Sequence, residues 1–151
     1  MKLQDALKTD RFRNNRHRAI LNMLYTAYWY KSQVSSILKD NGLTLEQFNV
    51  LRILKGKNPE AMCVKDIAGR MLEKSSNVPR IIDRLVKKKL VKRKTSKEDK
   101  RETLISMTDK GMEQVDTATR AVDKLDHKIL SLTDEDAVTL HELLEKLRLT
   151  D

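Results

Sequence analysis

In residues 76–88, apolar and basic side chains recur with the spacing of an α-helix. In a helix, but not in a strand, this spacing places the two kinds of side chain on opposite faces. At about 100° per residue, one side collects the apolar members and the other collects the polar and basic members. The apolar side consists of Val78, Ile81, Ile82, Leu85 and Val86. The opposite stripe consists of Asn77, Arg80, Arg84, Lys87 and Lys88. A chain with this segment must bury one face of a short helix and leave a cationic face uncovered.

The segments on either side of this helix predict a helix-turn-helix followed by a hairpin. A short helix is expected over 64–73, and Ser75 or Ser76 is expected to cap the basic helix, with Pro79 in its first turn. Residues 90–94 and 103–107 alternate as strands do, and the charged tip TSKEDKRE separates them.

Longer helices are predicted at both ends of the chain. One is expected over 10–40 with Thr9 as its cap, and another starts from the capping box of Thr44 and Gln47. Two more are expected over 108–130, capped by Thr108, and over 134–149, capped by Thr133 with Asp136. The chain holds only 4 Gly and 2 Pro, which favours such helices. The predicted fold is mainly α, a winged helix-turn-helix with long terminal helices. It forms one unit over 1–151, with a DNA-binding lobe at 44–107 and dimerisation regions at 1–40 and 108–151.

The positive charge is concentrated in the middle of the chain. Residues 65–101 hold 14 Lys/Arg and 5 Asp/Glu, a net charge of +9, which equals that of the whole chain. Residues 1–64 carry +6 and residues 102–151 carry −6. A concentrated basic segment indicates a polyanionic partner, either nucleic acid or an anionic membrane surface.

Motifs for catalysis, cofactors and metals are missing from the sequence. It has no Gly-rich phosphate loop, nucleophile elbow, H-E-x-x-H or Cys/His cluster, so we expect no enzyme, no cofactor and no metal site. The single cysteine, Cys63, allows no internal disulfide and is expected on a short buried strand with low reactivity. No apolar run reaches the ~20 residues that span a bilayer. We expect a cytoplasmic protein that does not bind membranes.

The basic helix fits the major groove of duplex DNA, where its first residues would reach the bases. We therefore assign Ser76, Asn77 and Arg80 to base contacts, with Ser75 beside them, and Arg84, Lys87 and Lys88 to phosphates. The hairpin tip, with Asp99, Lys100 and Arg101, would reach the minor groove, and Asp99 would hold Arg101 by a charge-assisted hydrogen bond. The alternative is an ordinary amphipathic helix with a solvated basic face.

The stretch from Val64 to Gly111 resembles the core of the MarR family of transcriptional regulators. The resemblance includes the helix-turn-helix, the D-x-R of Asp99 and Arg101, and the T-x-x-G of Thr108 and Gly111, although no proline precedes Asp99. It implies a regulator, more often a repressor, that binds a palindromic double-stranded operator as a two-fold homodimer. It also implies a binding site for a small, often phenolic, ligand.

Two further sets of residues complete the expectations. The candidate ligand pocket consists of Tyr25, Tyr28, Trp29 and Phe48, for which core packing is the alternative. The candidate dimer interface consists of Leu3, Leu7, Phe12, Leu125, Ile129, Leu140, Leu143, Leu144 and Leu147, for which a bundle within one chain is the alternative. Two other functions stay open: an architectural DNA-binding protein without a sensor, and a basic protein-interaction module.

Overall fold

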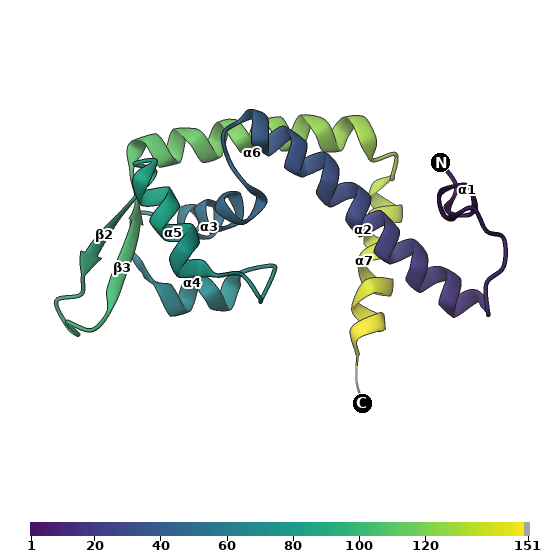
Figure 1. The fold of residues 1–151 in the computed structure, drawn as a ribbon, viewed down its shortest axis with the longest axis horizontal. Coiled ribbons are helices and arrows are strands. Elements are labelled where there is room, and N and C mark those ends of the chain that lie inside the picture. Colours follow the sequence, from purple (N-terminus) through teal and green to yellow (C-terminus); the bar gives the residue numbers. More distant parts are fainter. Residues whose placement is uncertain (150–151) are drawn as a thin grey trace.

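Two long helices, a lobe of shorter elements and two outlying terminal helices make up residues 1–149, the part of the chain that the computed structural model describes (Figure 1). The helices are α1 (Leu3–Leu7), α2 (Asn15–Asp40), α3 (Leu45–Lys55), α4 (Val64–Arg70), α5 (Val78–Lys87), α6 (Asp109–Ile129) and α7 (Asp134–Arg148). The strands are β1 (Met62–Cys63), β2 (Val91–Thr95) and β3 (Thr103–Met107). The predicted mainly α, winged helix-turn-helix fold is confirmed. None of the described helices is long and apolar enough to cross a membrane.

Side-chain caps set most helix starts, and one predicted cap is wrong. Thr44 and Gln47 form the predicted capping box of α3, and Thr133 and Asp136 form that of α7. Thr9, in contrast, does not cap the long N-terminal helix. That helix begins at Asn15, because the side chain of Asn14 accepts from the backbone N–H of His17 and satisfies the first turn. The preceding residues form the separate short helix α1.

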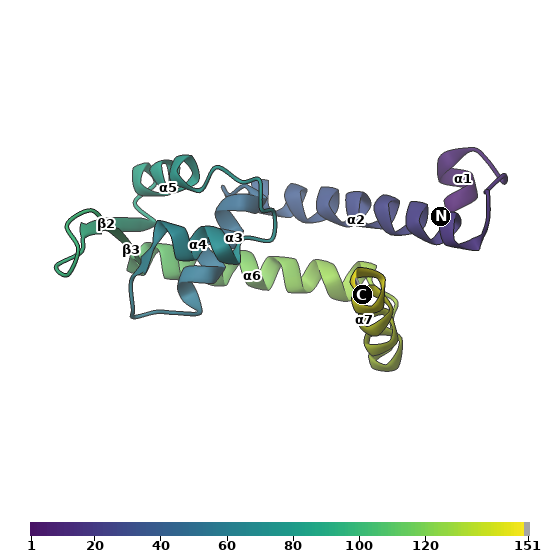
Figure 2. The same ribbon diagram turned by 90° about the horizontal axis from the view of Figure 1, so that it is seen from below.

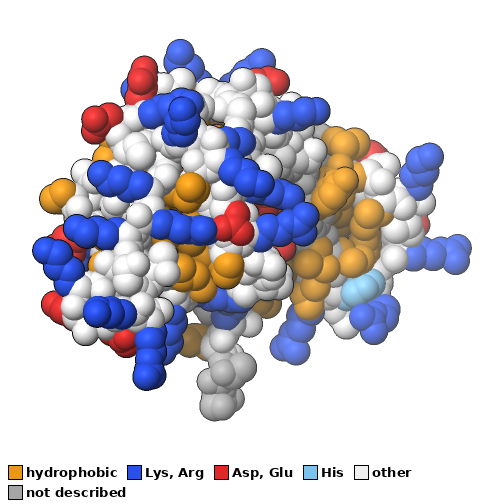
Figure 3. All heavy atoms as spheres, turned by 60° about the vertical axis from the view of Figure 1, so that its left-hand side comes forward, with side chains coloured by type: hydrophobic (Ala, Val, Ile, Leu, Met, Phe, Trp, Pro, Cys, Tyr) orange, Lys and Arg blue, Asp and Glu red, His pale blue; other side chains and the backbone are white. Residues whose placement is uncertain are grey.

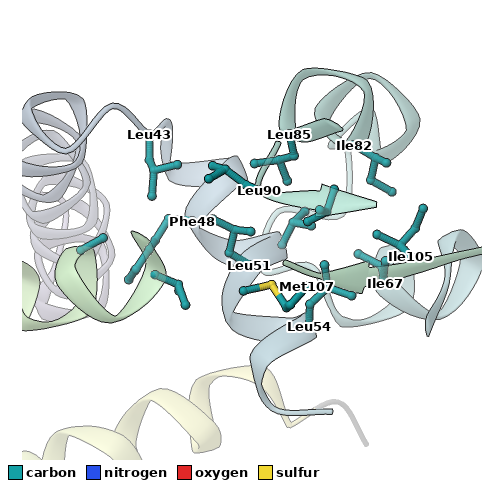
Figure 4. Close-up of a cluster of buried hydrophobic side chains, with 14 of the residues drawn as sticks. Leu43, Phe48, Leu51, Leu54, Ile67, Ile82, Leu85, Leu90, Ile105 and Met107 are labelled. Carbon is teal, nitrogen blue, oxygen red and sulfur yellow. The ribbon is translucent and has the colours of Figure 1, made fainter. Parts of the chain in front are cut away.

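The lobe is built around α3, whose buried side lies at its centre (Figure 4). Val50, Leu51 and Leu54 are at most 1% exposed, and they pack with side chains of α4, α5 and β3. Ile67 of α4 and Ile82 and Leu85 of α5 are fully buried in the same core. The apolar face of the basic helix therefore holds it against α3, as its spacing predicts. The helix α4 is shorter than predicted, ending at Arg70, and Leu72 is exposed rather than buried.

The small sheet joins the hairpin to the helix-turn-helix. Its strand order is β1-β3-β2, and both pairs are antiparallel. Met62 pairs with Ile105, and Val91 pairs with Met107, so β3 is the central strand. The predicted short strand at Cys63 is confirmed, but this residue is partly exposed and not buried.

The start of α6 lies unusually close to the end of α5. Thr108 follows β3 directly and caps α6 through the N–H of Gly111, and its single hydroxyl proton is shared between the carbonyls of Lys89 at 2.8 Å and Leu90 at 3.0 Å. A Cβ on Gly111 would lie 2.0 Å from that same Leu90 oxygen. The contact therefore requires glycine, which explains the T-x-x-G spacing in physical terms.

The long helices α2 and α6 lie side by side and extend away from the lobe (Figures 1 and 2). The Tyr30 hydroxyl of α2 donates to Asp126 of α6 at 2.9 Å. Burial, helped by this hydrogen bond, raises the pKa of Tyr30 to about 12, so the phenol keeps the proton that it donates at neutral pH. The last helix, α7, turns away from the end of α6, and none of its residues is buried.

Candidate nucleic-acid interface

The helix α5 presents the predicted cationic stripe to solvent. Val78, Ile82 and Leu85 are at most 2% exposed, whereas Arg80 and Arg84 on the other side are exposed. Pro79 lies in the first turn, as predicted. Figure 3 shows Lys and Arg side chains spread over this end of the molecule, with few acidic side chains among them. The face combines shape and charge as a major-groove helix requires.

The cap of α5 differs from the prediction. Neither Ser75 nor Ser76 caps the helix; instead the Asn77 side-chain oxygen accepts from the Arg80 N–H at 3.1 Å. Ser75 lies within 3.5 Å of Glu73, and the Ser76 hydroxyl is buried without a hydrogen-bond partner among the described residues. The turn is therefore longer and the helix begins two residues later than expected. Because the Asn77 oxygen serves the cap, a bidentate adenine contact by Asn77 would compete with that hydrogen bond.

A small polar hollow lies beside the first turns of α5. It has a volume of about 270 Å³, and its lining combines Arg80 and Arg84 with Glu73, the turn and the start of α3. Glu73 is paired with Lys31 of α2 at 2.9 Å, so an ion pair connects the turn to the long helix. This hydrogen bond lowers the pKa of Glu73 and raises that of Lys31.

Lys88 is the member of the stripe that the structure places differently. Its ammonium donates to the Gly42 carbonyl at 2.6 Å and to the Gln47 side chain at 2.9 Å. Lys88 therefore bonds to the corner between α2 and α3, whereas Lys87 projects to solvent. The sequence pattern assigned both lysines to phosphates because it records charge but not tertiary partners.

The hairpin forms a wing beside α5, and backbone hydrogen bonds order its tip. The Ser96 hydroxyl accepts from the N–H groups of Glu98 and Asp99, and Glu102 donates its N–H to the Asp99 carbonyl. The Asp99 carboxylate accepts from the backbone N–H of Arg101 at 2.9 Å. The expected charge-assisted hydrogen bond between Asp99 and Arg101 is therefore present, and its donor is the backbone N–H of Arg101. Asp99 shapes the turn, and the Arg101 side chain stays exposed beside Lys100.

Sequence reasoning missed the ion pair between Arg93 of β2 and Asp83 of α5. It connects the wing to the basic helix at their exposed surfaces. The sequence contains one indication of this ion pair, because Asp83 is the only acidic residue of α5. The pairing itself depends on how β2 lies against α5, which spacing along the chain does not reveal.

The candidate ligand pocket is not assembled in this structure. Phe48 belongs to the core, Tyr28 is 74% exposed, and none of the four predicted residues lines a second hollow, which is apolar. That hollow, of about 810 Å³, lies between α2 and α7. Its apolar lining consists of Ala19, Ile20, Met23, Ala27, Tyr30, Leu140, Leu143, Leu144 and Leu147.

Most of the candidate interface residues are uncovered in the single chain. Leu140, Leu143 and Leu147 are 45–59% exposed, and Leu7 is 39% exposed. Phe12, Leu125, Ile129 and Leu144 are partly exposed, and only Leu3 is buried by its own chain. The described residues therefore do not form the alternative closed bundle. Within the same residues, no group of acidic, histidine or cysteine side chains is arranged to hold a metal ion.

Comparison with known proteins identifies relatives of the same architecture. The model of the family described as transcriptional regulator SarA/Rot matches residues 32–118, from the second half of α2 into α6. The HTH-type transcriptional regulator YkoM of Bacillus subtilis (strain 168) is 33% identical over 78 residues, which cover 52% of this chain and 49% of YkoM. The match therefore spans about half the length of that relative.

Two solved structures have a similar fold over most of the chain. A MarR-like transcription regulator from Bacillus cereus ATCC 10987 superposes with a TM-score of 0.77 at 21% identity, covering 89% of this chain and 96% of that one. MepR of S. aureus, solved in complex with DNA, superposes with a TM-score of 0.74 at 23% identity, covering 87% and 95%.

Proposed function

The chain belongs to the SarA/Rot family of transcriptional regulators, and from this premise we propose that it binds a specific, roughly palindromic duplex DNA site as a homodimer. Residues 44–107 contact the DNA in this proposal. Residues 1–40 and 108–151 join the two copies, although residues 150–151 lie outside the described part of the chain. Such a regulator works where chromosomal DNA is, so we place it in the cytoplasm, and we assign it no catalytic activity.

One observation carries this proposal: α5 buries its apolar face on α3 and exposes its arginines next to a wing with an exposed arginine. A helix and an adjoining hairpin can then occupy neighbouring grooves of one duplex. Arg80, near the start of α5, is the base-reading residue, because Arg can donate two hydrogen bonds to a guanine edge. Arg84 and Lys87 lie further along the same face and neutralise phosphates.

The uncovered leucines of α7 support the homodimer. A helix without a single buried residue in its own chain needs another surface for its apolar side. The N-terminal 64 residues carry +6 and the last 50 carry −6, so the ends of two copies attract each other. The hollow between α2 and α7 receives the second copy in this proposal. The small aromatic ligand and the direction of regulation stay predictions.

Selection of genomic fragments by the purified protein tests the proposed function directly. We expect recovery of one inverted-repeat motif, bound at least ~10³-fold more tightly than a scrambled duplex. An architectural protein would instead bind many sequences equally. Absence of binding to any duplex at modest ionic strength would refute DNA binding altogether.

Replacing Arg101 with alanine is expected to weaken operator binding by about tenfold or more, because the wing loses the cation that enters the minor groove. Fluorescence anisotropy with the selected operator measures the change. Asp99→Asn is the control, since an asparagine oxygen can still accept from the Arg101 N–H and retain the turn. Equal losses in the two variants would contradict separate roles for Asp99 and Arg101.

Replacing Arg80 with alanine is expected to cost ~1–3 kcal/mol at a single base pair of the operator and to relax the preference there. The comparison is Arg84→Ala on the same face of α5, which should weaken all sequences alike and reduce the salt dependence. Binding to operators mutated one position at a time provides the measurement. If Arg80→Ala weakened every sequence equally, Arg80 would be a phosphate contact instead.

A further inference from the structure

Three segments that are far apart in the sequence meet at the C-terminal end of α5. They are the α2–α3 corner at Asn41 and Gly42, the end of α5 at 88–90, and the start of α6 at 108–114. We call this meeting point the α5 junction. The corner that follows α2 and the start of α6 both contact the end of the basic helix here.

Lys88 makes the central contacts of the α5 junction. Its ammonium is 2.6 Å from the Gly42 carbonyl oxygen and 2.9 Å from the Gln47 side-chain oxygen. Gln47 is only 3% exposed, and its oxygen also accepts from the Thr44 N–H within the capping box of α3. A charged donor on a buried acceptor is among the stronger hydrogen bonds in proteins, so Lys88 is held in place.

Further hydrogen bonds connect α6 to the same point. Lys110 donates to the Lys88 carbonyl at 3.2 Å, and the Thr108 hydroxyl donates to the Lys89 carbonyl at 2.8 Å. The Gln114 side chain donates to the Asn41 carbonyl at the end of α2. The end of α5 is therefore bonded both to the start of α6 and to the corner that follows α2.

Lys87 provides the contrast within the same pair of residues. Both lysines are exposed, but the side chain of Lys87 makes no hydrogen bond or ion pair with any residue that the structure describes. The two adjacent lysines have the same charge, but the side chain of Lys88 is hydrogen-bonded within the protein, whereas that of Lys87 is available to a partner.

We propose that Lys88 is a positioning residue, which fixes the orientation of the basic helix relative to the long helices and does not contact a DNA phosphate. This inference rests on the proposed function, because orientation matters only if α5 reads bases. Base contacts need donor and acceptor atoms aligned within hydrogen-bond distance, whereas attraction to phosphates tolerates a small tilt. Loss of the Lys88 contacts therefore lowers discrimination more than it lowers general affinity.

The test compares Lys88→Met with Lys87→Met, which remove the same charge one residue apart. For Lys88→Met we expect the ratio of operator to scrambled-duplex affinity to fall about tenfold, with the salt dependence of scrambled-duplex binding unchanged. For Lys87→Met we expect the ratio to stay constant and the salt slope to fall by about one. Lys88→Arg, which keeps a charged donor, should recover most of the ratio.

Hydrogen exchange of the DNA-free protein provides a second readout that does not depend on DNA binding. In Lys88→Met, the amides of residues 88–90 should exchange about tenfold faster, and in Lys87→Met they should not change. A Lys88→Met variant with an unchanged affinity ratio or a reduced salt slope would overturn the inference, as would unchanged exchange at 88–90. If the wild-type protein bound no duplex, the proposed function would fail, and exchange alone would decide whether Lys88 fixes the junction.

Discussion

Replacing Gly111 with alanine is expected to lower the free energy of unfolding by about 3 kcal/mol. The added Cβ would lie 2.0 Å from the Leu90 oxygen and 2.9 Å from its carbonyl carbon, and both are backbone atoms that cannot rotate away. Either α6 must move from the end of α5, or the Thr108 hydrogen bond to Leu90 must break. Thermal and urea unfolding measure the loss, which corresponds to a fall of about 10 °C in Tm for a chain of this size.

Gly69 provides a matched control for this substitution. It lies in α4, and a Cβ added there would meet nothing within 4 Å. Gly69→Ala should therefore stabilise the protein by ~0.5–1 kcal/mol through helix propensity. A Gly111→Ala variant as stable as Gly69→Ala would show that the close approach of α6 to Leu90 is absent in solution.

Replacing both Leu143 and Leu147 with glutamate is expected to raise the dissociation constant of the homodimer about a thousandfold or more. Each buried leucine contributes ~1.5–3 kcal/mol, and each carboxylate adds a desolvation cost. Both side chains are more than half exposed in the single chain, so the fold of the monomer should survive. Sedimentation over a range of concentrations measures the mass, and circular dichroism measures the helix content.

Leu72→Glu serves as the control for the dimer experiment. Leu72 is 90% exposed but lies in the turn before α5, away from the hollow between α2 and α7. This variant should keep the wild-type mass. A wild-type protein that is monomeric at all accessible concentrations, or a double variant that stays dimeric, would contradict the proposed interface.

Sequence patterns predicted those parts of the fold that depend on local chemistry. The two faces of α5, the hairpin around a charged tip, and the caps at Thr44, Thr108 and Thr133 all follow from residue type and spacing. The start of the long N-terminal helix was misplaced, because Thr9 and Asn14 both have the chemistry of a cap and tertiary structure decides between them. The predicted serine caps of α5 were also wrong, because Asn77 has the chemistry of a cap as well and lies closer to Pro79 in the first turn.

The composition of the candidate nucleic-acid interface could be predicted from the sequence, but the roles of its individual residues could not. Charge and periodicity identified Arg80, Arg84 and Lys87 as a stripe, and the structure exposes all three. They also placed Lys88 in that stripe, although its partners lie more than 40 residues earlier in the chain. Asp99 was predicted to hold Arg101 by a hydrogen bond and does so, although spacing along the chain did not reveal that the donor is the backbone N–H.

The direct passage from β3 through Thr108 into α6 has a mechanical consequence. Met107 ends the strand and Asp109 begins the helix, so no flexible loop separates the wing from the arm that leads to α7. A rotation of α6 would therefore also reposition the hairpin. A compound that binds at the α7 end of α6 could thereby change the affinity of the protein for its operator. Thermodynamic linkage then requires that the operator change the affinity for that compound by the same factor.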